Sequence, residues 1–102
     1  MEEALARVVV DISGRPYLPT VHTPPGYSSE SEKEEKYSLD YARQFLQAFI
    51  VHSGFTLHID LLYGRDFHHV LEALFKALGR ALDEATKIDP RIKGVPSTKG
   101  KL

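Results

Sequence analysis

Cysteine and tryptophan are absent from this chain of 102 residues. Without cysteine there can be no disulfide, no thiolate metal site and no iron–sulfur cluster, so any metal ligands must be histidine, aspartate or glutamate. No apolar run approaches the roughly 20 residues that span a bilayer, and no signal-peptide pattern follows Met1. We therefore expect a cytoplasmic protein that does not bind a membrane.

A strong net charge is also missing. The 13 lysines and arginines nearly balance the 14 aspartates and glutamates, so no overall field favours nucleic acid as a partner. A nucleic-acid-binding α+β domain is only a third hypothesis, supported by scattered lysines, and a failure to bind RNA or DNA would eliminate it. The length and a hydrophobic content of 42% suit one compact domain over residues 1–102.

The N-terminal third predicts two strands and a loop. Alternating apolar residues indicate a half-buried strand over residues 6–13. Residues 17–22 can form a second strand, at an edge or a bulge because Pro19 lacks a backbone donor, and the turn at 14–16 predicts a hairpin. The charged stretch 23–36 has almost nothing to bury and predicts a mobile surface loop, with partner binding as the alternative.

The remaining residues predict a helix, a strand and a second helix. Ser38 is the expected N-cap of the first helix and Gly54 its end. A strand follows over residues 55–63, and Asp66 should cap a helix that runs to about Lys87. The predicted core-facing residues are Leu39, Ala42, Phe45, Leu46, Phe49, Ile50, Phe55, Leu57, Ile59, Leu61, Tyr63, Phe67, Val70, Leu71, Leu74, Phe75, Leu78 and Leu82. The order predicts an α+β domain, a single β-β-α-β-α unit with both helices on one face of a small sheet.

Two adjacent histidines open the second helix in the pattern His-His-x-x-Glu. Successive helical residues point about 100° apart, so His68 and His69 cannot easily bind the same ion. Glu72 is four residues from His68 and three from His69, so it can share an ion with one of them. The helix therefore offers too few donors to saturate a transition metal, and other ligands must come from the fold, from water or from another chain. The apolar spacing of the helix predicts that His68, His69 and Glu72 direct their donors away from the core. The alternative is an exposed first turn whose histidines are merely solvated.

Other polar residues are weaker candidates. His22, His52 and His58 are predicted not to be ligands. A lone strand histidine such as His58 is usually structural, and a favourable contact with the helix dipole explains His52 in the last turn of its helix. Ser97 and Lys99 in the C-terminal tail (90–102) offer a hydroxyl and an ammonium that suit an anion. Arg15 and Lys76 have the same ambiguous potential.

Three ordered motifs closely resemble the second half of imidazoleglycerol-phosphate dehydratase: DISGRPYL at 11–18, TLHIDLLYGRDFHHVLEALFKALGRAL at 56–82 and VPSTKG at 95–100. The resemblance covers nearly the whole chain outside the 23–36 loop. It implies an internally duplicated fold of two β-β-α-β-α halves, a large oligomer, and metal sites, usually manganese, built at subunit contacts from one His-His-x-x-Glu in each half. Zn, Fe, Co or Ni are alternatives.

The resemblance also implies roles for individual residues. His68, His69 and Glu72 would be catalytic metal ligands, Lys76 would lie beside the substrate, and Arg15, Ser97 and Lys99 would hold its phosphate. The implied reaction is dehydration of imidazole glycerol phosphate to imidazole acetol phosphate in histidine biosynthesis. The metals would stabilise an imidazolate, so that the ring acts as an electron sink while glutamate moves protons.

Two departures from the family separate the hypotheses. The family chain is about twice as long, and its further ligand histidine in the first of the two helices corresponds here to Gln44. The leading hypothesis is a half-length or fragment dehydratase. The alternative is a non-catalytic, metal-binding, oligomerising half domain. In both cases we expect the chain to self-associate into a homo-oligomer or to pair with a missing N-terminal half, because one chain presents the motif once.

Overall fold

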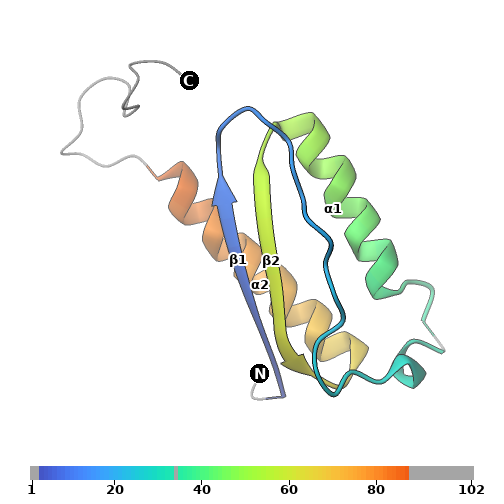
Figure 1. Ribbon diagram of the computed structural model, residues 1–102. Helices are drawn as coiled ribbons and strands as arrows, with labels where there is room; N and C mark the ends of the chain where they lie inside the picture. Colours follow the sequence, from blue (N-terminus) through green and yellow to red (C-terminus); the bar gives the residue numbers. More distant parts are fainter. Residues whose placement is uncertain (1–2, 34, 88–102) are drawn as a thin grey trace.

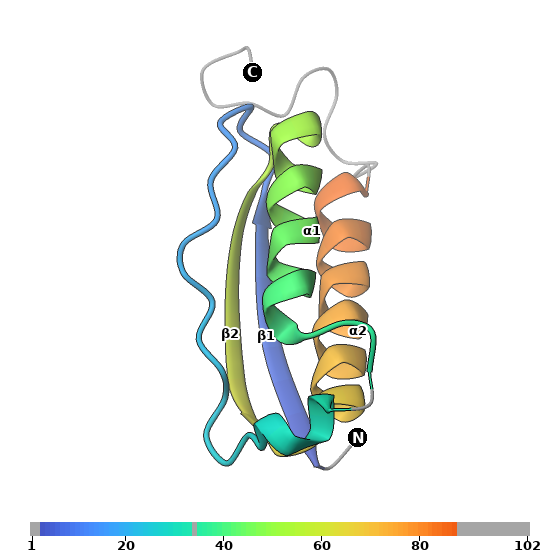
Figure 2. The ribbon, with the colours of Figure 1, turned by 90° about the vertical axis from the view of Figure 1, so that its right-hand side faces the viewer.

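Two antiparallel strands carry two long helices on one face, which confirms the predicted α+β half-unit. The computed structural model describes residues 3–33 and 35–87. Strand β1 (Ala4–Asp11) pairs with β2 (Thr56–Gly64), and α1 (Leu39–Ser53) and α2 (Phe67–Thr86) both lie behind this pair (Figures 1 and 2). A short 3₁₀ helix, η1 (Ser29–Glu32), precedes α1. Neither α1 nor α2, the long helices of the described residues, combines the length and apolarity that a membrane crossing requires.

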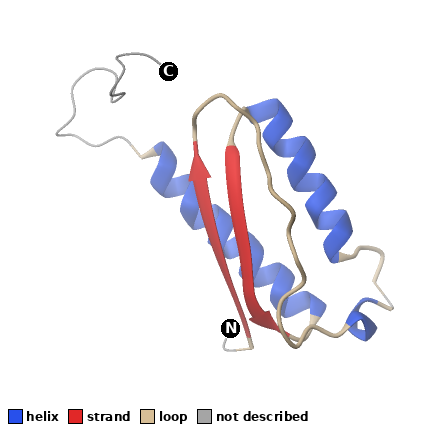
Figure 3. Ribbon diagram, viewed as in Figure 1, coloured by secondary structure: helices blue, strands red, loops and turns tan. Residues whose placement is uncertain are grey.

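The second predicted strand is reduced to a single bridge. Tyr17 pairs in parallel with Thr56, through hydrogen bonds from Tyr17 N to Phe55 O (3.3 Å) and from Leu57 N to Tyr17 O (2.9 Å). The chain then runs as an extended loop beside β2 (Figure 3). The predicted hairpin is therefore wrong, because the 14–16 turn carries the chain across to the β2 edge and not back along β1. Pro19 has no N–H with which to continue the ladder.

The predicted helix ends are confirmed. The Ser38 hydroxyl accepts a hydrogen bond from Tyr41 N at 3.2 Å and caps α1. Gly54 ends that helix with φ of 74°, a left-handed conformation that glycine adopts without a steric penalty. The Asp66 carboxylate accepts from His68 N at 2.9 Å and caps α2. These local signals fix where the His-His-x-x-Glu motif begins.

The core lies between the strands and the helices, and its buried residues include nine of the eighteen that were predicted. Buried apolar side chains are Ala4, Ala42, Leu46, Ile50, Leu57, Ile59, Phe67, Val70, Leu74 and Leu78. Phe45 (57% exposed) and Phe75 (38%) do not belong to the core, contrary to prediction. Their rings lie 6.3 Å apart between α1 and α2. The apolar stripes are wider than the narrow sheet that they cover.

A β-bulge explains why Tyr63 is also exposed. Leu5 pairs with Tyr63 and Ala6 with Leu61, so Leu62 is an extra residue on β2. One inserted residue reverses the inward and outward alternation beyond it. Tyr63, predicted to face the core, is consequently 44% exposed.

The charged stretch 23–36 is attached to the start of α2. Ser28 N donates to Arg65 O at 2.9 Å, and Phe67 N donates to the Ser31 hydroxyl at 2.8 Å. The Tyr27 hydroxyl donates to the Glu32 carboxylate. The sequence predicted a loop here without η1 or these contacts, which attach the stretch that carries Glu35 to the start of α2.

Candidate metal centre

His68 lies in the first turn of α2, on the side away from the core. Phe67 beside it is buried, whereas the His68 side chain is 64% exposed. Its Nε2 lies 2.8 Å from Oε2 of Glu35. The predicted outward direction of this histidine is confirmed, and the Glu35 contact is a feature that sequence reasoning missed. Glu35 stands in an acid-rich run whose pattern gives no signal to distinguish one carboxylate from the next.

His69 points in a different direction and is more enclosed. Its Nδ1 is buried without a hydrogen-bond partner among the described residues, and the nearest carboxylate oxygen, Oε1 of Glu3, is 3.7 Å away. The ring borders a surface hollow lined by Glu3, Pro25, Tyr63, Gly64, Arg65 and Asp66. Buried polar atoms usually have a hydrogen-bond partner, so Nδ1 of His69 is itself a candidate to bind a ligand.

Glu72 and Lys76 occupy the next turns of the exposed side of α2. Glu72 Oε2 lies 3.3 Å from Lys76 Nζ, an i,i+4 pair that is about half exposed. Such a surface pair contributes at most about 1 kcal/mol. The carboxylate can therefore exchange this lysine for another charged ligand at little cost.

The donors do not converge on one point within a single chain. In the described part of the chain, no group of three His, Asp or Glu side chains is close enough to hold a metal ion. The residue types suit a divalent metal with nitrogen and oxygen ligands. What the described residues provide is a partial donor set at one end of the molecule.

Arg15, one of the predicted anion-binding residues, lies far from the motif. Arg15 is exposed in the turn before Tyr17, where Thr56 Oγ1 donates to its backbone oxygen at 2.7 Å. Thr56 begins β2, while His68 follows the end of β2, so Arg15 and the motif lie at opposite ends of the molecule (Figure 1). At about 3.3 Å per residue, a strand of nine residues separates them by roughly 30 Å. Ser97 and Lys99 lie outside the described residues.

The side chain of Gln44, the position where the resemblance implies a ligand histidine, is held by a local contact. Its side-chain nitrogen donates to Asp40 Oδ2 at 2.7 Å, and Arg43 donates to Oδ1 of the same carboxylate at 2.9 Å. The hydrogen bonds from Arg43 and then Gln44 lower the pKa of Asp40. An amide held in this way is a poorer metal donor than an imidazole.

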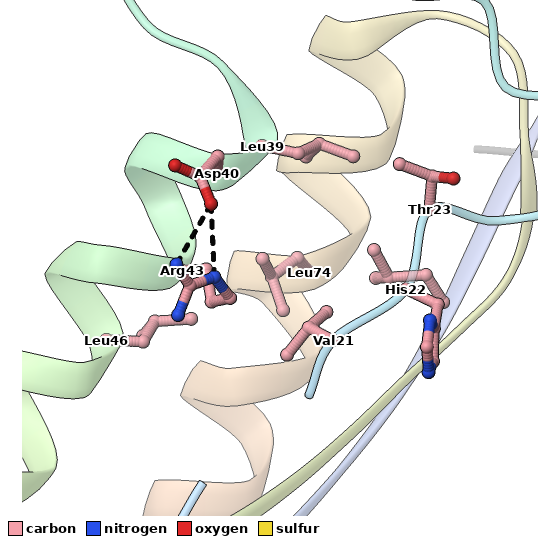
Figure 4. Close-up of a pocket in the computed structure, with 9 residues that line it drawn as sticks. Val21, His22, Thr23, Leu39, Asp40, Arg43, Leu46 and Leu74 are labelled. Atoms are coloured by element: carbon pink, nitrogen blue, oxygen red, sulfur yellow. Dashed lines mark hydrogen bonds and ion pairs between the residues drawn. The ribbon is translucent and has the colours of Figure 1, made fainter. Parts of the chain in front are cut away.

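A small cavity beside this contact contains none of the motif residues. It has a volume of about 160 Å³ and lies between the extended segment at Val21–Thr23 and the two helices. Figure 4 shows the Asp40–Arg43 pair and Leu46 on one side, His22 on the other, and Leu74 and Val21 between them. His22 and His58 were predicted not to be ligands. His58 packs edge-on against Tyr17, with ring centroids 6.4 Å apart.

Comparison with known proteins identifies the relatives of this chain. The sequence model of the imidazoleglycerol-phosphate dehydratase family matches residues 1–82. The imidazoleglycerol-phosphate dehydratase of Pelobacter propionicus is 52% identical over 104 residues, and that of Thermoanaerobacter pseudethanolicus is 50% identical over 102. In each case the match covers all of this chain and 50% of the relative, so the chain spans about half the length of these proteins.

Solved structures agree with the sequence relatives. The crystal structure of the dehydratase from Staphylococcus aureus has a TM-score of 0.73 and 43% identity, over 87% of this chain and 49% of that one. The Pyrococcus furiosus enzyme has a TM-score of 0.78 and 38% identity, over 100% of this chain and 53% of that one. The half-unit described above, with its His-His-x-x-Glu at the start of α2, belongs to the imidazoleglycerol-phosphate dehydratase family.

Proposed function

We propose that this chain supplies one half of a cytoplasmic, metal-dependent dehydratase that removes water from imidazole glycerol phosphate in histidine biosynthesis. The observation that carries the proposal is the His-His-x-x-Glu motif in a chain of this family. Asp66 caps the helix at that point, and His68 and Glu72 lie on its exposed side. The names of the relatives support the reaction, and the chain's half length makes the activity of this chain a matter for experiment.

The residues present fit a divalent metal as partial ligands. His68 and His69 offer imidazole nitrogens in two directions, and Glu72 offers a carboxylate that is held only by a surface lysine. The metal, Mn or alternatively Zn, Fe, Co or Ni, would stabilise negative charge on the imidazole of the substrate when bound. Glu72 is also within the first turns of the helix, where it can move a proton to or from a substrate that the histidines position.

The phosphate would be held by Arg15, Ser97 and Lys99, with Lys76 beside the substrate. One small substrate cannot reach both Arg15 and His68 of the same chain, because about a full strand length separates them. We propose that a complete site combines the metal end of one half-unit with the phosphate end of another. A second copy of this chain, or a separate N-terminal half, would provide the additional half-unit.

The test is metal analysis of the purified chain together with its mass in solution and an assay for the dehydration product. We expect bound divalent metal, a symmetric homo-oligomer, and product formation that depends on metal. His68→Ala should lose metal, whereas His52→Ala, a histidine near the end of α1, should retain it. A monomer that binds no metal and shows no activity, even with an N-terminal half supplied, would contradict the proposal.

A specific observation favours a second candidate, a metal-binding half domain that assembles without catalysis. The Gln44 amide is bonded to Asp40 where the family has a histidine ligand. Gln44→His separates the two candidates. If the wild-type chain binds metal without turnover and Gln44→His restores product formation, the natural chain is a non-catalytic module. If the wild-type chain turns over substrate, Gln44 does not prevent catalysis.

A further inference from the structure

The contact between Glu35 and His68 joins two segments that are distant in sequence. Oε2 of Glu35 lies 2.8 Å from Nε2 of His68, a distance typical of a hydrogen bond to a charged acceptor. Glu35 is the more enclosed partner, with 30% of its side chain exposed against 64% for His68. The Glu35 carboxylate therefore contacts Nε2 of the His68 ring and not Nδ1.

The backbone on the Glu35 side is fixed relative to α2. Ser28 N donates to Arg65 O at 2.9 Å, and Phe67 N donates to Ser31 Oγ at 2.8 Å, so η1 is bonded to the residues on both sides of the α2 cap. Glu35 N then donates to Glu32 O at 3.1 Å. The acceptor is positioned by the same turn that begins the metal-binding helix.

A neutral imidazole carries one N–H donor and one lone pair. If Nε2 donates its hydrogen to Glu35, the lone pair is on Nδ1 and only Nδ1 can bind a metal. We propose that Glu35 is a positioning residue for His68, which fixes its Nε2–H tautomer and leaves Nδ1 as the metal donor. The inference rests on the proposed metal-binding function and adds to it a residue outside the His-His-x-x-Glu motif.

His69 offers a contrast within the same turn. The nearest carboxylate oxygen, on Glu3, is 3.7 Å from its Nδ1, beyond hydrogen-bond distance. The described structure therefore gives His68, and not His69, a carboxylate partner that selects one nitrogen. The two rings should consequently differ in tautomer preference before any metal binds.

The experiment uses the full chain, first without metal, at a pH well above the usual histidine pKa of about 6.5. Nitrogen-15 NMR distinguishes the two neutral tautomers of each ring. We expect His68 to be in the Nε2–H form in the wild type and to become a mixture in Glu35→Ala. Glu30→Ala is the matched control, because Glu30 is in the same acidic segment but pairs with Lys33. It should leave the His68 spectrum unchanged.

The second measurement is Mn²⁺ affinity, from the free ion detected by electron paramagnetic resonance. Removal of such a partner typically weakens metal binding about 10–100-fold. We expect a loss in this range for Glu35→Ala, a smaller loss for Glu35→Gln, which keeps an acceptor oxygen, and none for Glu30→Ala. Tighter Mn²⁺ binding by Glu35→Ala would overturn the inference, because Glu35 would then block the nitrogen that the metal needs.

The two proposals fail in different ways. A wild-type chain that does not bind Mn²⁺ contradicts the proposed metal chemistry, and with it the metal-donor part of the inference. A wild-type chain that binds Mn²⁺, but whose His68 is an Nδ1–H tautomer or does not respond to Glu35→Ala, overturns the Glu35 inference and leaves the proposed function standing.

Discussion

Gly64 is buried where β2 leads into α2, and a side chain has no room there. A Cβ at this position would lie 2.5 Å from Cγ2 of Val70 and 3.1 Å from Cβ of Ala4. We expect Gly64→Ala to lower the free energy of unfolding by about 1–3 kcal/mol, the usual cost of overpacking a core. Gly79→Ala in α2 is the control, because nothing lies within 4 Å of its added Cβ. Urea unfolding should find Gly79→Ala at least as stable as the wild type. A Gly64→Ala variant as stable as the wild type would contradict the close packing of Gly64 against Val70 and Ala4.

Tyr27 gives a pH-dependent prediction. Burial and then the neighbouring Glu32 carboxylate raise the pKa of Tyr27 above its usual value of 10.0. The neutral hydroxyl therefore stabilises the fold below that pH, and this contribution is lost as pH rises through 10 toward the folded pKa. Tyr27→Phe should be about 1 kcal/mol less stable than the wild type at neutral pH.

This difference should shrink above pH 10, where the unfolded tyrosine ionises more easily than the folded one. Urea unfolding at a series of pH values measures it. A Tyr27→Phe difference that stays constant across alkaline pH would contradict the effect of Glu32.

At the scale of the element, the cap of α2 should link the stability of the fold to the proposed metal binding. Asp66→Ala removes the oxygen that accepts from His68 N and should cost about 1 kcal/mol. Ser38→Ala removes the equivalent cap of α1 at a similar cost. Because only Asp66 caps the turn that carries His68 and His69, Asp66→Ala alone should also weaken Mn²⁺ binding. Equal Mn²⁺ affinity of both variants at equal stability would show that the first turn keeps its structure without the cap.

These elements show which parts of the fold were predictable. Ser38, Gly54 and Asp66 act through hydrogen bonds or backbone angles within a few residues, so their patterns predict helix ends well. The pairing of β1 with β2 and the bulge at Leu62 depend on residues 45 to 60 positions apart. No local pattern encodes such pairing, and the predicted hairpin was consequently wrong.

The candidate site likewise has features that the sequence predicted and others that it did not. The motif predicted which residue types could hold a metal and that His68 faces outward. It did not predict the Glu35 contact, because Glu35 is one of several acids in a stretch with no periodic pattern. Arg15 and His68 are far apart because Arg15 contacts Thr56 at the start of β2, whereas His68 follows the end of that strand. Contacts between distant segments require the structure.

At the scale of the whole molecule, the outer face of the two helices is unusually apolar for a surface. A groove between α1 and α2 is lined by Tyr37, Tyr41, Phe45, Leu71 and Phe75, which we call the aromatic helix face. Phe45 is 57% exposed and Tyr41 55%. A contiguous exposed apolar patch of this kind is typical of an interaction surface. The relatives of this chain are about twice as long as the chain itself. We therefore expect a second half-unit to cover this face.

The last prediction therefore concerns how half-units associate. If a second copy covers the aromatic helix face, a charged side chain at the centre of that face is either buried without a partner, which costs free energy, or keeps the two copies apart. Burying one phenylalanine contributes about 1.5–3 kcal/mol, so Phe45→Lys should weaken association at least about tenfold. Val9→Lys is the control, because Val9 is 51% exposed on β1 and alternates onto the sheet face away from the helices. Sedimentation velocity over a range of concentrations should show Phe45→Lys dissociating while Val9→Lys keeps the wild-type mass. Retention of the oligomer by Phe45→Lys would place the contact elsewhere, and dissociation by Val9→Lys alone would place it on the open face of the sheet.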